Sequence, residues 1–298
     1  MTITRRLLTG LVLLLPSLLA ATAQAEIIHE ERSLYRNILV REQGDRRCLI
    51  FTVRRSDRNQ SCIDLEDPDH LVFPYARMMF AGLLLNEAPE RMLMVGLGGA
   101  SLPRVFAELF PEAEQDLVEI DAAVVRVAED YFLFEPTEQM DVHVRDARVF
   151  VKRALARGEQ YDYVMLDAFT GDYIPEHLLT QEFLEEVKGI LAPGGVLVAN
   201  TFSSSRLYHH ESATYAAVFE HVAELRLPIT LNRILVAYDG PWPARGELSA
   251  RAEALAPRVR RFGITTGPLA QNLNPDFRYD EGARVLTDQY SPANLLSQ

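Results

Sequence analysis

The chain has 298 residues, 48% of them hydrophobic, and a formal net charge of -12. Nucleic acids and anionic membrane surfaces require clustered Lys and Arg, so this acidic balance excludes both from the expected partners. It is compatible with a cationic substrate, and the length suits one large globular domain with at most a small appendage.

The first residues carry the pattern of a secretory signal peptide. Arg5 and Arg6 form a short basic start, and residues 7–20 are almost wholly apolar. Residues 23–25 then offer a small-x-small cleavage site. An uncleaved membrane anchor is the alternative, but the apolar run is shorter than the about 20 residues that cross a bilayer. We therefore expect residues 1–25 to be removed, the chain to be exported to the periplasm, and no membrane span to remain.

Residues 26–70 are predicted to form a small β-rich domain. Apolar and β-branched stretches alternate here with polar turns, as in an antiparallel sheet. The predicted strands cover residues 34–40, 48–53 and 61–65.

The chain has two cysteines, Cys48 and Cys62. An isolated pair in an exported protein usually forms a disulfide, whereas two unrelated buried thiols are common in cytosolic chains. We therefore predict a disulfide between neighbouring strands of the small sheet. No metal site is expected, because the adjacent His209 and His210 lack spaced Cys or His partners.

Residues 71–298 are predicted to form the larger domain. After a helix over residues 71–85, short apolar strands alternate with helices, which is typical of a doubly wound, mostly parallel α/β sheet. The predicted strands cover residues 91–95, 116–120, 142–144, 163–166 and 196–200, and the helices between them cover 102–110, 122–131, 147–156 and 180–191. The tail gives a helix over 212–225, a strand over 229–237, an amphipathic helix over 248–261 and irregular structure over 263–277.

In an open parallel sheet, ligands bind outside the carboxyl ends of the strands. Three of the four segments that follow the first four strands carry an acid, and the other is a glycine-rich turn. The candidate ligand-binding residues at this edge are Gly96, Gly98, Gly99, Glu119, Asp121, Asp146, Ala147 and Asp167.

These residue types suit the parts of a nucleoside. A glycine turn lets the backbone approach a ligand closely. A carboxylate at Glu119 suits both ribose hydroxyls, and one at Asp146 suits the exocyclic amine of adenine. Taken singly, Asp121 and Asp146 also suit helix N-caps. The order of the acids along the sheet favours a nucleoside site.

A dinucleotide-binding enzyme is the obvious alternative, because G-x-G-x-x-G also precedes an acid about 20 residues on. The sixth position of that motif is Ser101 here. A dinucleotide fold also leaves the acid after the third strand unexplained, so an adenosyl ligand fits better.

Several segments resemble the spermidine synthases (polyamine aminopropyltransferases). Residues 92–104 are similar to that family's strand and glycine loop, residues 118–121 to its ribose-binding element, and residues 145–147 to its adenine-binding element. Tyr75 and Asp167 fall where the family has a tyrosine and an aspartate at the reacting amine.

The resemblance implies a seven-strand, S-adenosylmethionine-dependent methyltransferase-like Rossmann fold. It also implies decarboxylated S-adenosylmethionine as donor co-substrate, a polyamine-type cation as acceptor, and methylthioadenosine as product. Asp167 would take or orient the amine proton with the help of Tyr75. Asp172 and Tyr173 would bind the acceptor from the loop that closes over it.

The chain departs from the family pattern at three places. Gly99 stands where the family's glycine loop has an aspartate that holds the donor's amine. Ala76 and Arg77 replace a Gln or His and an acid, which puts a cation where a cationic substrate is expected. Asp172 substitutes for a second acid at a different spacing. Residues 167–183, with the end of the chain, resemble a divergent bacterial branch of the family.

Two other functions therefore stay open. Loss of the acid at Gly99 removes a repulsion against the carboxylate of intact S-adenosylmethionine, which favours a methyltransferase. Loss of the acid at Arg77 favours a non-catalytic protein that binds polyamines or nucleosides. The sequence leaves open whether the chain forms a homodimer.

Overall fold

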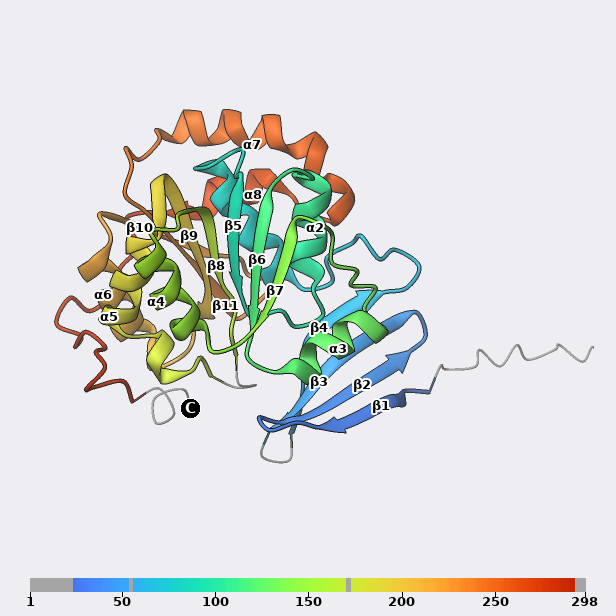
Figure 1. The fold of residues 1–298 in the computed structure, drawn as a ribbon. Helices are drawn as coiled ribbons and strands as arrows, with labels where there is room; N and C mark the ends of the chain where they lie inside the picture. Colours follow the sequence, from blue (N-terminus) through green and yellow to red (C-terminus); the bar gives the residue numbers. More distant parts are fainter. Residues whose placement is uncertain (1–23, 54–55, 170–172, 293–298) are drawn as a thin grey trace, which may run out of the picture.

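The computed structural model describes residues 24–53, 56–169 and 173–292, which fold into two β-sheets with helices around them (Figure 1). The predicted signal peptide, residues 1–25, lies almost entirely outside these ranges. No helix within them is long and apolar enough to cross a membrane.

The first sheet is a four-stranded antiparallel meander in the order β1-β2-β3-β4. Its strands are β1 (Glu26–Arg32), β2 (Asn37–Gln43), β3 (Arg46–Val53) and β4 (Ser56–Asp64). The small N-terminal antiparallel sheet is thus confirmed. β1 was not predicted as a separate strand, because Ile27 and Ile28 are its only apolar residues.

Helix α3 (Ala122–Tyr131) covers one face of this small sheet (Figure 1). Ile38 and Val40 alternate on β2 with the two-residue period of a strand, so both point to the same face. They are fully buried in one apolar cluster with Val124 and Phe132. This contact packs the small sheet against the larger domain.

Cys48 and Cys62 lie directly opposite each other on β3 and β4, with Cα atoms 4.1 Å apart, and form a disulfide. The predicted bond between neighbouring strands is therefore confirmed. It ties the edge strand β4 to its neighbour β3.

The second sheet has the order β12-β10-β11-β9-β8-β5-β6-β7. Its parallel strands are β5 (Arg91–Val95), β6 (Glu114–Glu119), β7 (Met140–Val144), β8 (Tyr161–Leu166) and β9 (Leu191–Phe202). The antiparallel pairs are added by β10 (His221–Arg226), β11 (Asn232–Tyr238) and β12 (Leu273–Asn274). The doubly wound, mostly parallel α/β fold is confirmed, with the two-residue β12 added to seven strands.

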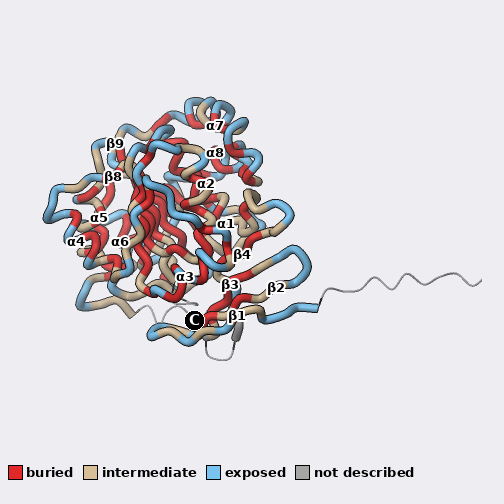
Figure 2. The backbone as a smooth tube through the Cα atoms, turned by 45° about the vertical axis from the view of Figure 1, so that its right-hand side comes forward, coloured by how far each residue is buried: buried red, intermediate tan, exposed pale blue. Residues whose placement is uncertain are grey.

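Helices cover both faces of this sheet. One face carries α1 (Pro74–Met78), the 3-10 helix η1 (Met79–Leu84), α2 (Ser101–Leu109), α7 (Arg245–Val259), η3 (Arg260–Phe262) and α8 (Thr266–Asn272). The other carries α4 (Ala147–Arg157), η2 (Glu176–Leu178), α5 (Gln181–Gly189) and α6 (Tyr208–Val218). On β5, Met92 faces the first group and Leu93 the second, so the strand is buried on both sides. Figure 2 shows this buried layer between the helices.

Two predicted elements of the tail were wrong. The helix expected over 212–225 ends at Val218, and the rest becomes β10, because pairing with β11 and β12 buries Ala223 and Leu225. The irregular stretch expected over 263–277 contains α8 and β12. Tertiary packing outweighs local propensity at both places.

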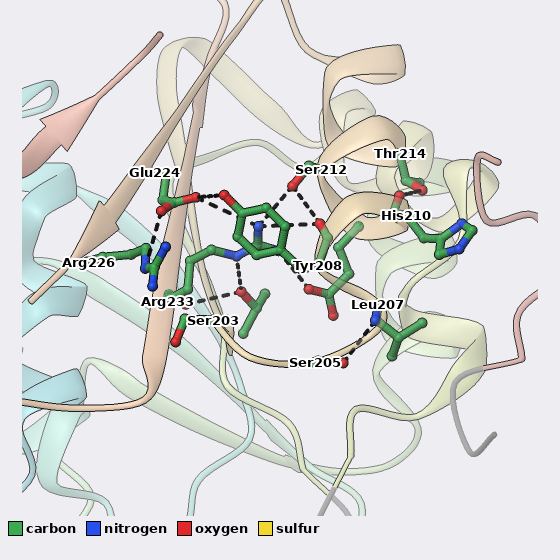
Figure 3. Close-up of polar contacts among 12 residues, drawn as sticks. Ser203, Ser205, Leu207, Tyr208, His210, Ser212, Thr214, Glu224, Arg226 and Arg233 are labelled. Atoms are coloured by element: carbon green, nitrogen blue, oxygen red, sulfur yellow. Dashed lines mark hydrogen bonds and ion pairs between the residues drawn. The ribbon is translucent and has the colours of Figure 1, made fainter. Parts of the chain in front are cut away.

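A buried polar group, here called the Arg233 cluster, lies between α6 and the strands β9, β10 and β11, and its members are Thr201, Tyr208, Glu211, Ser212, Glu224 and Arg233. Figure 3 shows Tyr208, Ser212, Glu224 and Arg233 of this group. The Arg233 guanidinium is fully buried and donates to Glu211 Oε2 at 2.7 Å, Ser212 Oγ at 2.8 Å and Thr201 Oγ1 at 2.9 Å. Its charge also lies 4.1 Å from the centre of the Tyr208 ring. The cluster joins α6 to the strands β9, β10 and β11.

Candidate active site

A cavity of about 430 Å³ lies between the small sheet and the carboxyl ends of the parallel strands. This volume falls in the range of small-molecule sites. The small sheet, α1, the segments after β5, β6, β7 and β8, and the end of β9 all contribute to its wall. Among the predicted site residues, the wall contains Tyr75, Gly96, Gly98, Glu119, Asp146, Ala147 and Asp167.

Gly96 brings the glycine loop against the end of β8. Its φ is +94°, and a Cβ at this position would lie 2.4 Å from the Asp167 carbonyl oxygen. Only glycine combines that conformation with so close a backbone approach. The glycine loop after β5 and Asp167 therefore share one corner of the cavity.

Glu119 is fixed by backbone groups at the end of β6. Its Oε2 accepts from the Leu97 N–H and its Oε1 from the Asp121 N–H, each at 3.1 Å. Burial raises the pKa of the Glu119 carboxyl, while these two bonds and the Arg36 charge oppose the rise. Each oxygen keeps a lone pair for a ligand hydroxyl.

Asp146 both caps α4 and lines the cavity. Its Oδ1 accepts from the Val149 N–H at 3.0 Å, and its Oδ2 lies 2.8 Å from His177 Nε2. The N-cap interpretation of Asp146 is thus confirmed, and the residue still stands beside Ala147 in the wall.

Asp121 and Gly99 do not reach the cavity wall. Asp121 caps α3 through Ala123, and its Oδ2 accepts from Ser33 Oγ at 2.5 Å, so it holds the small sheet instead. A Cβ at Gly99 would lie 2.8 Å from Ser61 Oγ and 3.0 Å from a ring carbon of Phe132. The space that an aspartate would need at Gly99 is therefore filled.

Asp167 and Tyr75 face each other in the wall. Burial raises the pKa of the Asp167 carboxyl to about 7, although bonds from Asn200 and Tyr75 oppose the rise. Burial, and then the charge of Asp167 and a bond to it, raise the pKa of the Tyr75 hydroxyl well above its usual value. That hydroxyl also lies 3.5 Å from the Gln60 carbonyl oxygen of β4. A carboxyl whose pKa lies near neutral pH, beside a tyrosine that stays protonated, is suited to proton transfer.

Of the residues predicted for the acceptor, Asp172 lies outside the described residues, and Tyr173 is not part of the cavity wall. The expectation that Arg77 places a cation in the acceptor region was wrong. Arg77 is absent from the wall, and its Nη1 lies 3.5 Å from the Gly263 carbonyl oxygen. Ala76, next to Tyr75, lines the wall instead.

Sequence reasoning missed several polar residues of the wall. Arg36 donates to the Phe169 carbonyl oxygen at 3.0 Å and stacks on Phe51, so it links the small sheet to the loop after β8. Asn200, at 2.8 Å from Asp167 Oδ1, ends a predicted strand and could have been identified from that position. Asn232 gives no such signal. The other charged or titratable residues in the wall are Tyr35, Arg58, Arg145 and His177.

The described part of the chain holds no group of three or more His, Cys, Asp or Glu residues placed to bind a metal ion. The acids of the wall are engaged with backbone amides, His177, Asn200 and Tyr75 instead.

The role at a ribose that the sequence predicts for Glu119 can be tested directly. Glu119→Ala should weaken the binding of methylthioadenosine by about 1–3 kcal/mol, because the ribose hydroxyls would lose their acceptor along with two backbone N–H groups. Titration calorimetry measures the effect. Glu112→Ala, at an exposed position, is the matched control and should leave binding unchanged. Equal affinities for Glu119→Ala and the parent would place the ribose elsewhere.

The order β7-β6-β5-β8-β9-β11-β10, with acids after successive strands, defines the class of the chain: an S-adenosylmethionine methyltransferase-like Rossmann fold. Among solved structures, a probable spermidine synthase from Corynebacterium glutamicum matches 88% of this chain and 99% of its own, with a TM-score of 0.66 and 25% identity. Human methyltransferase-like protein 13 in complex with SAH matches 63% of this chain and 93% of its own, with a TM-score of 0.59 and 32% identity.

The spermine/spermidine synthase domain profile matches residues 72–228. A polyamine aminopropyltransferase from Vibrio vulnificus is 49% identical over 276 residues, which cover 92% of each chain. One from Chromobacterium violaceum is 34% identical and covers 78% of this chain and 88% of its own. The chain therefore belongs to the spermine/spermidine synthase family.

Proposed function

We propose that this chain transfers an aminopropyl group from decarboxylated S-adenosylmethionine to an amine of the polyamine class. The observation that carries the proposal is Asp167, a half-buried carboxyl held by Asn200 and Tyr75 in the same cavity wall as Glu119. Its pKa of about 7 suits a group that must accept a proton at neutral pH.

In the proposed reaction, the neutral amine nitrogen attacks the aminopropyl carbon bound to the sulfonium. The C–N bond forms as the C–S bond breaks, and the bonding electron pair returns to sulfur. Methylthioadenosine leaves as a neutral thioether, and the proton of the amine passes to Asp167. Glu119 and Asp146 would hold ribose and adenine, which fixes the donor carbon in line with the amine.

The relatives and one feature of the loop support a second candidate, methyl transfer from intact S-adenosylmethionine. An enzyme named eEF1A lysine and N-terminal methyltransferase, from Homo sapiens, is 33% identical over 66% of this chain. Gly99, packed against Ser61, offers no acid to repel the donor's carboxylate. The assay below separates the two reactions.

The deciding measurement is release of methylthioadenosine from decarboxylated S-adenosylmethionine, with putrescine, cadaverine or spermidine as acceptor. Aminopropyl transfer predicts release that depends on the acceptor. No release from folded protein that binds the donor would remove this function. Release of S-adenosylhomocysteine from the intact donor would establish methyl transfer instead, and tight binding of spermidine alone would favour a binding protein.

The reaction should depend on pH through Asp167. Because the carboxylate must be ionised to accept a proton, kcat/KM should fall as the pH drops through about 7. The sulfonium of the bound donor favours the ionised form, so the same decline in kcat should occur at lower pH. Rate profiles from pH 5 to 9 measure both. A kcat/KM that is flat through this range would contradict the role of Asp167.

We further propose that the chain acts in the periplasm after removal of residues 1–25. The basic start, the apolar run and the Cys48–Cys62 disulfide support this, since disulfides persist in oxidising compartments. Cell fractionation with N-terminal sequencing of the mature protein tests it, and a cytoplasmic protein that retains Met1 would contradict it.

A further inference from the structure

A row of hydrogen bonds runs from the edge of the sheet to Asp167. Thr230 Oγ1 donates to Asn232 Oδ1 at 2.7 Å, and Asn232 Nδ2 donates to Asn200 Oδ1 at 2.9 Å. Asn200 Nδ2 then donates to Asp167 Oδ1 at 2.8 Å. Here this row is called the amide chain, and all four of its side chains line the cavity.

The direction of the amide chain is fixed at both ends. A carboxylate only accepts, so Asn200 must turn its NH2 group towards Asp167 and its oxygen towards Asn232. At the other end, the Asn232 backbone N–H donates to Thr230 Oγ1 at 3.1 Å, which leaves the Thr230 hydroxyl proton for the Asn232 oxygen. Every side-chain donor therefore points towards the carboxylate.

The strand register explains why the two amides meet. In the antiparallel pair β9–β11, Asn200 lies opposite Ile234 and Asn232 opposite Phe202. Asn200 and Asn232 are thus diagonal neighbours on one face of the sheet. The next residues inward on this face, Val198 and Ile234, are fully buried. Polar side chains at the end of an apolar row need partners, and each amide here supplies one to the other.

We propose that Asn232 and Thr230 are positioning residues that act through Asn200 on Asp167. The inference rests on the proposed function. The amide chain holds Oδ1 of Asp167 and leaves Oδ2 for the amine, while Tyr75 from α1 bonds to the same carboxyl. Because aligned dipoles point their positive ends at the carboxylate, they also favour its ionised form. Neither Asn232 nor Thr230 needs to touch the reacting atoms for this effect.

Two pairs of variants test the amide chain. Thr230→Val removes the hydroxyl with little change of shape, and Thr230→Ser keeps it. Asn232→Ala removes the link to Asn200, whereas Asn232→Gln keeps the amide. We expect Asn232→Ala to lower kcat about tenfold or more, since a bond in a row that ends on a charged group is lost. Thr230→Val should have a smaller effect in the same direction, and Thr230→Ser should behave like the parent.

The pH at which Asp167 titrates distinguishes a positioning role of Asn232 and Thr230 from a purely structural one, because a structural role would leave that pH unchanged. Carbon-13 NMR of labelled aspartate, with Asp167→Asn to assign the signal, follows the carboxyl directly. In Asn232→Ala and Thr230→Val, the Asp167 titration should move to higher pH, and the decline of kcat/KM should move with it. Urea unfolding verifies that the variants are folded.

The inference would be overturned if Asp167 titrated at the same pH in both variants as in the parent, while both variants were folded and bound methylthioadenosine as the parent does. The NMR measurement needs no turnover, so it decides the effect on Asp167 even if the parent releases no methylthioadenosine. Lack of release would instead reject the proposed function. The two failures are therefore distinguishable.

Discussion

Asp167→Asn should reduce the release of methylthioadenosine about 10²–10⁴-fold while binding of the nucleoside stays within a factor of two or so. Asparagine keeps the shape of the side chain and can still accept from Asn200, but it cannot take the proton of the attacking amine. Steady-state kinetics and calorimetry with methylthioadenosine measure the two quantities separately.

The matched control is Asp130→Asn, an exposed aspartate on α3. The pKa of Asp167 is raised in the folded protein, so its ionisation above pH 7 costs stability, and Asp167→Asn removes that cost. The variant should therefore be at least as stable as the parent at pH 8. Full activity of Asp167→Asn would show that another group accepts the proton.

Arg233→Met should lower the free energy of unfolding by about 3–5 kcal/mol, because it leaves the buried Glu211 carboxylate without its cation. Burial already raises the pKa of Glu211, and Arg233 opposes that rise. Without the arginine, Glu211 should stay protonated to higher pH, so the deficit should shrink as the pH falls. Urea unfolding at pH 5 and pH 8 measures both effects.

The same region supplies a matched control. Arg226 pairs with Glu224 at 3.5 Å but is about half exposed (Figure 3). Exposed pairs contribute about 0–1 kcal/mol, so Arg226→Met should change stability little. The double variant Arg233→Met with Glu211→Gln should recover part of the loss, since no unpaired charge remains. Equal losses for Arg226→Met and Arg233→Met would contradict the role of burial.

The residues at the strand ends could be predicted because they follow from local pattern. Glu119 ends β6, Asp146 and Asp167 follow the ends of β7 and β8, and parallel strands bring their carboxyl ends to one edge. The direction in which each of these side chains points could not be predicted from the local pattern. Asp121 lies two residues beyond Glu119, yet it caps a helix and binds Ser33 from the small sheet.

The rest of the wall depends on contacts between distant segments. Arg36 and Gln60 come from the small sheet, and Asn232 comes from an antiparallel strand added after the parallel ones. No spacing in the sequence relates these positions to Asp167. The same holds for β10, whose residues read as the end of a helix until their pairing with β11 is known.

The cavity has two walls of different origin, and that division separates two kinds of sequence change. The parallel strands supply Glu119 and Asp146, whereas β4, clamped by the Cys48–Cys62 disulfide, supplies Gln60 beside Tyr75. A substitution at Gln60 can therefore alter the surroundings of Tyr75 while Glu119 and Asp146, which stand on the other wall, keep their hydrogen-bond partners. Under the proposed function, this division lets acceptor preference diverge while donor recognition is retained.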